Sequence, residues 1–116
     1  MGAPITHFEI MGGKGKELEK FYSELFGWNI DSNNPMNYGM VEAGGQGGIN
    51  GGVGPNEDGA SRVTVYAQVA DLQATLDKAE SLGGKTILPP TDVPDGPTLA
   101  MFADPAGNVT GILKSR

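Results

Sequence analysis

Two ionisable side chains on one predicted strand are the chain's first candidates for chemistry. His7 and Glu9 alternate with Thr6 and Phe8 along residues 5–10, so both ionisable groups face the same side. They could act as an acid–base pair, or Glu9 could be a buried carboxylate paired with Lys or Arg. His7 is the only histidine and cysteine is absent, which excludes Cys–His chemistry, a thiolate metal site and a disulfide. A lone histidine on a strand is more often a hydrogen-bonded pocket or core residue than a metal ligand.

Aromatic residues and a glycine-rich run are the next candidates. Trp28, Tyr38 and Tyr66 could stack on a flat ligand, although ordinary packing explains them equally well. The glycine-rich residues 44–55 are not followed directly by a helix, as a phosphate-binding loop requires. They predict a bulged or closely approached strand that ends in a surface loop at residues 56–60.

The elements that must position these side chains follow the same order in both halves of the chain. Each half predicts strand, helix, strand, strand, strand, and Leu18-Glu19-Lys20 recurs as Leu76-Asp77-Lys78. Gly27 is placed to end the first helix, whose apolar face combines Leu18, Phe21, Tyr22, Leu25 and Phe26. Asp71 is placed to cap the second helix, whose apolar face runs from Leu72 to Leu82. The predicted strands cover residues 5–10, 28–31, 36–43, 62–69, 85–88, 99–103 and 109–113, with a proline-rich connection over 89–97.

The last two strands flank a tight turn. Asp104-Pro105-Ala106-Gly107-Asn108 combines a residue that bonds forward onto the backbone, a preset φ and two positions that tolerate positive φ. The fold class that this order predicts is α+β. Two βαβββ modules, about 1–58 and 59–116 of a single domain 1–116, form paired curved mixed sheets around a concave pocket, with the helices outside.

Composition limits the partners. The formal net charge of −6 leaves no basic cluster for nucleic acid, and no apolar run is long enough for a membrane span. The opening residues have neither the basic nor the apolar part of a signal peptide, so we expect a cytoplasmic protein.

Four segments together resemble the glyoxalase/bleomycin resistance protein/dioxygenase superfamily, also called vicinal oxygen chelate proteins. They are residues 4–10, Phe-Tyr-Ser-Glu-Leu-Phe-Gly-Trp at 21–28, residues 66–84, and Phe-Ala-Asp-Pro-Ala-Gly-Asn at 102–108. The resemblance covers nearly the whole chain. It implies the paired βαβββ fold, commonly as a homodimer, and in enzymatic members a divalent metal held by about four His or Glu side chains.

Most of the metal positions that the resemblance implies carry other residues here. His7 stands 14 residues before Phe21, as the first ligand does. The third position falls on Thr64, or on Val65 if the register slips, and the fourth falls on Gly111. The second falls in the glycine-rich run around 49–52, which has no carboxylate. Glu42 lies nearby, but we expect it on the preceding strand. We therefore expect no catalytic metal and no other cofactor; the alternative is a divalent metal that uses His7.

The function that follows is small-molecule binding, for example of an antibiotic or a metabolite, without a catalytic metal. The alternative is a divergent lyase, isomerase or dioxygenase, with or without a metal, in which His7 and Glu9 or Glu42 act as acid and base. The sequence leaves open whether the chain is an enzyme. The expected pocket comprises His7, Glu9, Trp28, Tyr38, Met40, Thr64, Tyr66, Gln68 and Gly111.

Overall fold

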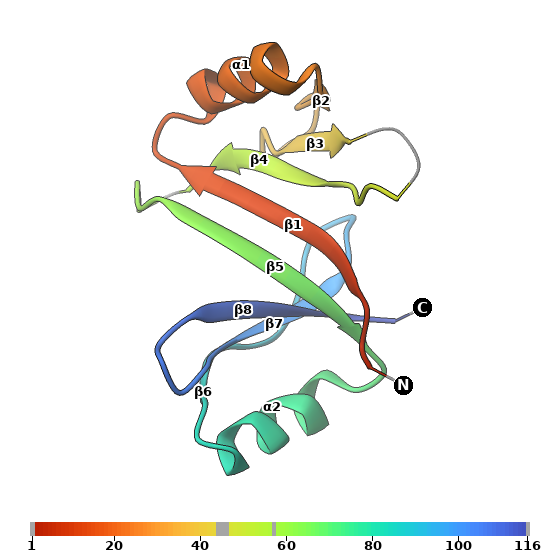
Figure 1. The fold of residues 1–116 in the computed structure, drawn as a ribbon, viewed down its shortest axis with the longest axis vertical. Coiled ribbons are helices and arrows are strands. Elements are labelled where there is room, and N and C mark those ends of the chain that lie inside the picture. Colours follow the sequence, from red (N-terminus) through yellow and green to blue (C-terminus); the bar gives the residue numbers. More distant parts are fainter. Residues whose placement is uncertain (1, 44–46, 57, 116) are drawn as a thin grey trace. The chain divides into compact units, whose positions relative to one another are not determined.

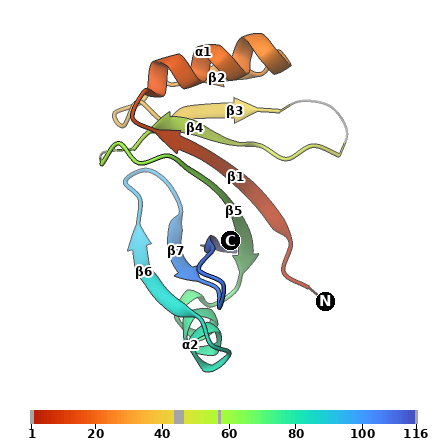
Figure 2. The same cartoon turned by 60° about the vertical axis from the view of Figure 1, so that its left-hand side comes forward.

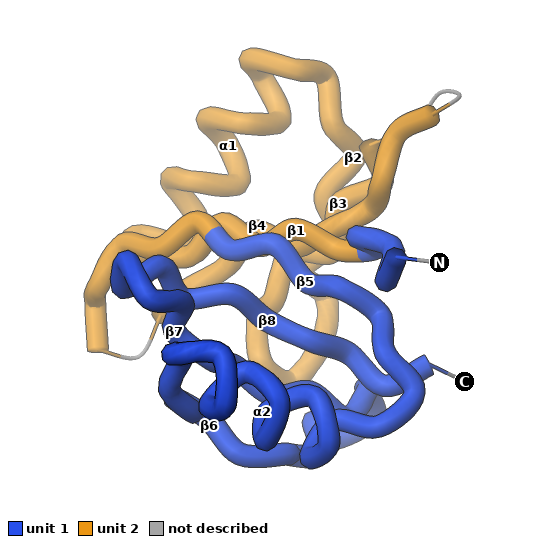
Figure 3. The backbone as a smooth tube through the Cα atoms, turned by 60° about the horizontal axis from the view of Figure 1, so that its bottom comes forward, with its two compact units in different colours: residues 1–6, 64–116 blue, residues 7–63 orange. Residues whose placement is uncertain are grey.

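The computed structural model describes residues 2–43, 47–56 and 58–115, and these fall into two units. Residues 7–63 form the N-terminal unit; residues 1–6 and 64–116 form the C-terminal unit (Figure 3). Two strands cross the division, because β1 (Ile5–Gly12) begins in the C-terminal unit and β5 (Arg62–Val69) begins in the N-terminal unit.

The N-terminal unit carries α1 (Gly15–Phe26) on a small mixed sheet. Its strands follow the order β2 (Asn29–Asp31), β3 (Gly39–Glu42), β4 (Gly51–Pro55) and β1, with β1 parallel to β4 and the other pairs antiparallel. Gly27 ends α1 in the left-handed conformation, at φ 70°, and its N–H donates to the Ser23 carbonyl. The predicted helix end is therefore confirmed.

The C-terminal unit repeats this arrangement. Its strands follow the order β5, β8 (Val109–Lys114), β7 (Thr98–Ala103) and β6 (Lys85–Asp92), with β5 parallel to β8. Helix α2 (Leu72–Ser81) begins at Asp71, whose carboxylate accepts from the Ala74 N–H as predicted. Figures 1 and 2 show one helix accompanying the strands of each unit. The α+β class and the two mixed βαβββ modules are thus confirmed, whereas a pocket formed by both modules stays a prediction.

The C-terminal unit has the better-defined apolar core. Leu72 and Leu76 of α2 pack with Ala100 and Ile112, and Ala67, Val69 and Phe102 join this cluster at its margin. The predicted face of α2 extended to Leu82, but this residue lies past the helix end and is 69% exposed. In the N-terminal unit, α1 has no buried residue, and Phe21 is 57% exposed. Phe21 packs edge-on against Tyr22, and the aromatic packing continues through Phe8, Phe26 and Trp28.

Two predicted strand boundaries need correction. The strand expected over 36–43 covers only Gly39–Glu42, because Asn34 makes two hydrogen bonds with the Tyr38 backbone and Asn37 takes a positive φ of 53°. The strand expected over 85–88 continues to Asp92, through Pro89 and Pro90. Because β6 is at the end of the strand order, prolines fit there where a central strand would exclude them.

The turn before β8 is organised by Asp104. Its carboxylate accepts from the backbone N–H groups of Ala106 and Asn108 and from the Asn108 side-chain amide. These bonds, the one from the Asn108 side chain most of all, hold the pKa of Asp104 below its ordinary value. The hairpin turn predicted from Asp-Pro-x-Gly-Asn is confirmed, with Gly107 at φ 92°.

Candidate functional site

Four polar side chains of the N-terminal unit form a continuous row of hydrogen bonds. The Arg62 Nη2 donates to Glu9 Oε1 at 2.8 Å, and the Tyr38 hydroxyl donates to Glu9 Oε2 at 3.0 Å. The His7 Nε2 lies 2.9 Å from the same Tyr38 hydroxyl. Both oxygens of Glu9, which is only 8% exposed, therefore have donors. Of the two possibilities for Glu9, a carboxylate paired with Lys or Arg matches this geometry.

This row assigns the tautomer of His7. Tyr38 has one hydroxyl hydrogen, and the hydroxyl donates it to the Glu9 carboxylate, so that hydrogen points to Glu9. The Tyr38 oxygen must then accept from His7, which places a proton on Nε2 and the basic lone pair of neutral His7 on Nδ1. Burial lowers the pKa of His7 below its ordinary 6.5, while the Glu9 charge opposes that shift.

The lowered pKa of His7 makes stability depend on pH. Between pH 6.5 and the lower pKa of the folded state, the unfolded chain binds more protons at His7 than the folded chain does. We expect His7's contribution to stability to be complete above pH 6.5 and to fall as the pH drops below it. Urea unfolding at pH 7.5, 6.5 and 5.5 measures this loss. The His7→Gln variant keeps a donor toward Tyr38 but does not titrate, so it should lose less stability over this range. An identical loss in the variant and the wild type would contradict the lowered pKa of His7.

Glycine at residue 52 makes the row possible. Gly52 of β4 pairs with Glu9 of β1, and Tyr38 lies across it. A Cβ at residue 52 would stand 1.8 Å from the Tyr38 hydroxyl oxygen and 1.9 Å from the ring carbon that bears it. The sequence prediction of a closely approached strand is confirmed here, and the approaching group is Tyr38.

The C-terminal unit repeats this relation with different residues. Gly111 of β8 pairs with Tyr66 of β5, and a Cβ at residue 111 would stand 2.2 Å from two carbons of the Tyr66 ring. Tyr66 is 2% exposed. Each unit thus covers a glycine of its last strand with a tyrosine ring.

Thr64 adds an uncompensated polar atom to the C-terminal unit. It is 2% exposed, and within the described part of the chain its hydroxyl has no hydrogen-bond partner. Leaving such a group unsatisfied costs about 1–3 kcal/mol. Along β5, Thr64, Tyr66 and Gln68 alternate with the residues that join the α2 core.

The remaining predicted site residues make no hydrogen bond to this row that the structure shows. Trp28 stacks on Tyr22 of α1 with ring centroids 5.7 Å apart and contacts Phe8, so it belongs to the aromatic packing. Met40 of β3 pairs with Gly52 and is exposed. Glu42 is exposed on β3, which precedes β4 in the chain. It therefore lies one strand before the implied ligand position, as expected from the family resemblance.

Sequence reasoning missed Arg62 and the specific role of Gly52. Arg62 is 53 residues from Glu9 in the chain. The available signal was Glu9 itself, since a carboxylate predicted on a largely buried strand needs a cation. The sequence indicated a Lys or Arg partner for Glu9 but did not indicate which residue it was.

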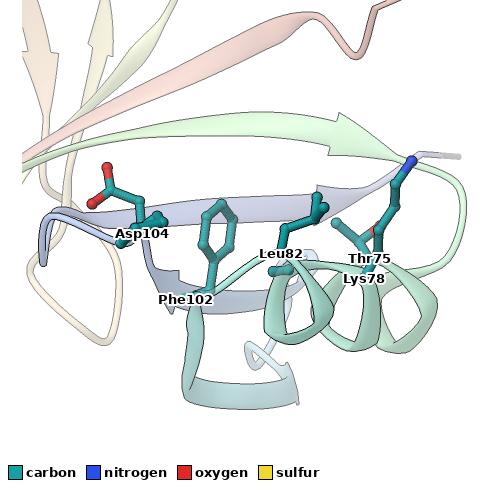
Figure 4. A pocket seen from close by; sticks show the side chains of 8 residues that line it. Thr75, Lys78, Leu82, Phe102 and Asp104 are labelled. Carbon is teal, nitrogen blue, oxygen red and sulfur yellow. The ribbon is translucent and has the colours of Figure 1, made fainter.

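One hollow lies outside all the predicted site residues. It has a volume of about 290 Å³ and lies in the C-terminal unit, beside α2 and the start of the β7–β8 turn. Figure 4 shows the Phe102 ring between Leu82 and Asp104, with Thr75 and Lys78 on the helix. Its walls are mostly apolar carbon.

The family model for the glyoxalase/bleomycin resistance protein/dioxygenase superfamily matches residues 5–112. The chain belongs to this superfamily. The match includes His7, both glycines covered by tyrosine, and the Asp104 turn, so the family resemblance of the sequence is confirmed.

Curated relatives of this superfamily member come from mycobacteria. Proteins named "Putative glyoxylase CFP32", from Mycobacterium bovis and Mycobacterium tuberculosis, are 30% identical to it over 103 residues. The alignment covers 81% of this chain and 39% of each relative. The chain therefore spans about two-fifths of the length of the curated relatives it matches.

Solved structures support the same fold. The Mn(II)-bound glyoxalase from Novosphingobium aromaticivorans has a TM-score of 0.68 at 14% identity, covering 97% of this chain and 38% of that one. Methylmalonyl-CoA epimerase from Mycobacterium tuberculosis has a TM-score of 0.64 at 12% identity, covering 97% of this chain and 87% of that one. At these identities the likeness concerns the fold alone.

The residues of this superfamily member do not fit the metal of the metal-dependent members. Of the positions that the family resemblance implies, Thr64 offers a hydroxyl and Gly111 has no side chain, and Tyr66 fills the space that a side chain at 111 would need. His7 is bonded to Tyr38, and Glu9 to Arg62. Within residues 2–43, 47–56 and 58–115, no group of three or more His, Cys, Asp or Glu could hold a metal ion.

Proposed function

We propose that this superfamily member binds a small molecule, such as an antibiotic or a metabolite, without a catalytic metal. The observation that carries the proposal is the pair of tyrosines that cover Gly52 and Gly111. In each last strand, where a metal-dependent relative would be expected to place a ligand, the aromatic ring takes the space of the side chain.

The polar groups that remain suit ligand recognition. A binding site needs a few polar groups fixed in position among apolar surface. In the N-terminal unit, the row from Arg62 to His7 fixes the Tyr38 hydroxyl, and exposed Met40 supplies apolar surface on the neighbouring strand. In the C-terminal unit, the buried Thr64 hydroxyl is a polar group that the described protein does not satisfy. A ligand that bonded to Thr64 would recover its cost.

Metal analysis tests the proposal directly. We expect protein purified without a metal-affinity tag to contain well under one equivalent of Zn, Ni, Mn or Fe by mass spectrometry. A ligand found by thermal-shift screening should keep its shift after chelator treatment and dialysis. Tight stoichiometric metal binding that is lost in His7→Ala would contradict the proposal.

Two variants of the same residue type localise the ligand. Thr64→Val should reduce the thermal shift caused by that ligand, whereas Thr91→Val, at an exposed position of β6, should not.

Within the described residues, no helix is long and apolar enough to cross a membrane. A cytoplasmic location and a homodimer stay predictions from the sequence and the family resemblance.

A further inference from the structure

The ion pair between Arg62 and Glu9 has one of the two hydrogen bonds that such a pair can form. Arginine and carboxylate commonly meet through two parallel hydrogen bonds. Here Nη2 donates to Oε1, while the Arg62 Nε is buried and has no hydrogen-bond partner among the described residues. One more acceptor oxygen would complete the pair.

The oxygen that could complete it is held by Tyr38. Glu9 Oε2 accepts from the Tyr38 hydroxyl at 3.0 Å, and Gly52 leaves the space that this hydroxyl occupies. A carboxylate oxygen can accept two hydrogen bonds, so the two donors compete for the orientation of the Glu9 carboxylate: while Oε2 is bonded to Tyr38, Nε has no acceptor. If another acceptor took the Tyr38 hydrogen, Oε2 would be released to Nε, and the number of hydrogen bonds would rise by one.

The surrounding charge selects a neutral acceptor. The Tyr38 hydroxyl bonds directly to the Glu9 carboxylate, whereas Arg62 bonds to the other oxygen of that carboxylate, and His7, with its lowered pKa, is uncharged at pH 7. An anion bonded to Tyr38 would stand beside the Glu9 carboxylate, only one hydrogen bond away, and the chain as a whole has a net charge of −6. A carbonyl oxygen accepts the same hydrogen bond without this repulsion.

We propose that Tyr38 is the ligand-recognising group and that it acts by exchange. Its hydroxyl transfers its hydrogen bond from Glu9 to the carbonyl oxygen of a neutral ligand, and Glu9 then closes a two-point pair on Arg62. This deepens the proposed function, on which it rests, by naming the ligand class: neutral molecules with an accessible carbonyl, such as amides, lactams or esters. Both the recognition and the preference for neutral ligands follow from one shared carboxylate.

The Arg62 Nε–H signal reports the exchange by NMR. Arg62 and Arg116 are the only arginines, so the spectrum of arginine Nε–H groups has two signals, and Arg62→Lys assigns them. In Tyr38→Phe, Glu9 loses its competing donor, so the Arg62 signal should shift toward a hydrogen-bonded position and exchange more slowly with water. Tyr22→Phe, at a tyrosine in the aromatic packing of α1, is the matched control and should leave the signal unchanged.

Benzamide and benzoate form a matched pair of probes, since they share a shape and differ in charge. Titrating benzamide into the wild type should move the Arg62 signal in the direction seen in Tyr38→Phe, with a Kd of about 1 mM for a ligand of this size. Benzoate should bind at least about tenfold more weakly, because of its repulsion from Glu9. Tyr38→Phe should lose benzamide binding although Arg62 is intact.

Four results would overturn the inference. The first three are an Arg62 signal that does not change in Tyr38→Phe, benzamide binding that survives this substitution, and benzoate binding as tight as that of benzamide. An absence of any benzamide effect on Arg62 up to about 20 mM, well above the expected Kd, counts equally against it. If screening ligands bind metal-free protein without moving the Arg62 signal, the proposed function stands and the exchange fails. Stoichiometric metal that depends on His7 would instead remove the proposed function.

Discussion

Replacing Gly111 by alanine should lower the free energy of unfolding by about 3 kcal/mol. The new Cβ would stand 2.2 Å from two atoms of the Tyr66 ring, far inside van der Waals contact. Tyr66 is 2% exposed, so its ring cannot move into solvent to relieve the clash. The strands β5 and β8 would have to separate locally, and the hydrogen bonds between them would weaken.

Urea unfolding of matched glycine variants measures this effect. Gly2→Ala is the control, since nothing lies within 4 Å of a Cβ at that residue. Gly52→Ala should cost less than Gly111→Ala, because Tyr38 is only half-buried and its ring can turn outward. A near-neutral Gly111→Ala would show that Tyr66 does not lie on the glycine as described.

Replacing Arg62 by methionine should cost about 2–3 kcal/mol, because it leaves the Glu9 carboxylate without its cation. Removing one partner of a fully buried pair costs roughly 3–5 kcal/mol. The lower figure applies here because the Arg62 side chain is one-third exposed and Tyr38 still donates to Glu9.

A double-mutant cycle separates the pair from its surroundings. Adding Glu9→Gln to Arg62→Met should recover part of the loss, because an uncharged amide no longer needs the cation. The exposed pair Lys20–Glu24 on α1 supplies the comparison, and Lys20→Met should cost under about 1 kcal/mol. If Lys20→Met and Arg62→Met lowered the free energy of unfolding equally, Glu9 would be solvated rather than buried.

Local signals along the chain were sufficient to predict most of the fold. The apolar spacing of α1, the glycine after it and the Asp71 cap are short-range features, and each took the expected conformation. The repeated order of elements then gave two βαβββ modules, because each sheet pairs its first and last strands in parallel in the same way.

The boundaries that differed depend on longer-range neighbours. Pro89 and Pro90 argued for the end of a strand, but the pairing of β6 with β7 resumes at Thr91 after shifts in register. The segment before Gly39 alternates like a strand, yet the bonds from Asn34 turn its backbone away. In both cases the competing contact is invisible in the local pattern.

The candidate site was predicted only as far as one strand defines it. Alternation placed His7 and Glu9 on the same face, and the structure joins both to Tyr38. Arg62 comes from a strand 53 residues further on, and the spacing within β1 says nothing about it. The contact of a tyrosine with each glycine also depends on the pairing of strands. From the sequence alone, Gly111 therefore indicated only that a metal ligand was missing, and not that the Tyr66 ring occupies the space of its side chain.

The prolines of β6 also bear on how copies of this chain can associate. A sheet grows at its edge when a new strand finds backbone N–H donors there, and Pro89 and Pro90 have none. Both are exposed at the end of the strand order of the C-terminal unit. That edge is therefore a poor template for strand addition, which guards against edge-to-edge aggregation and directs any pairing of copies toward other surfaces.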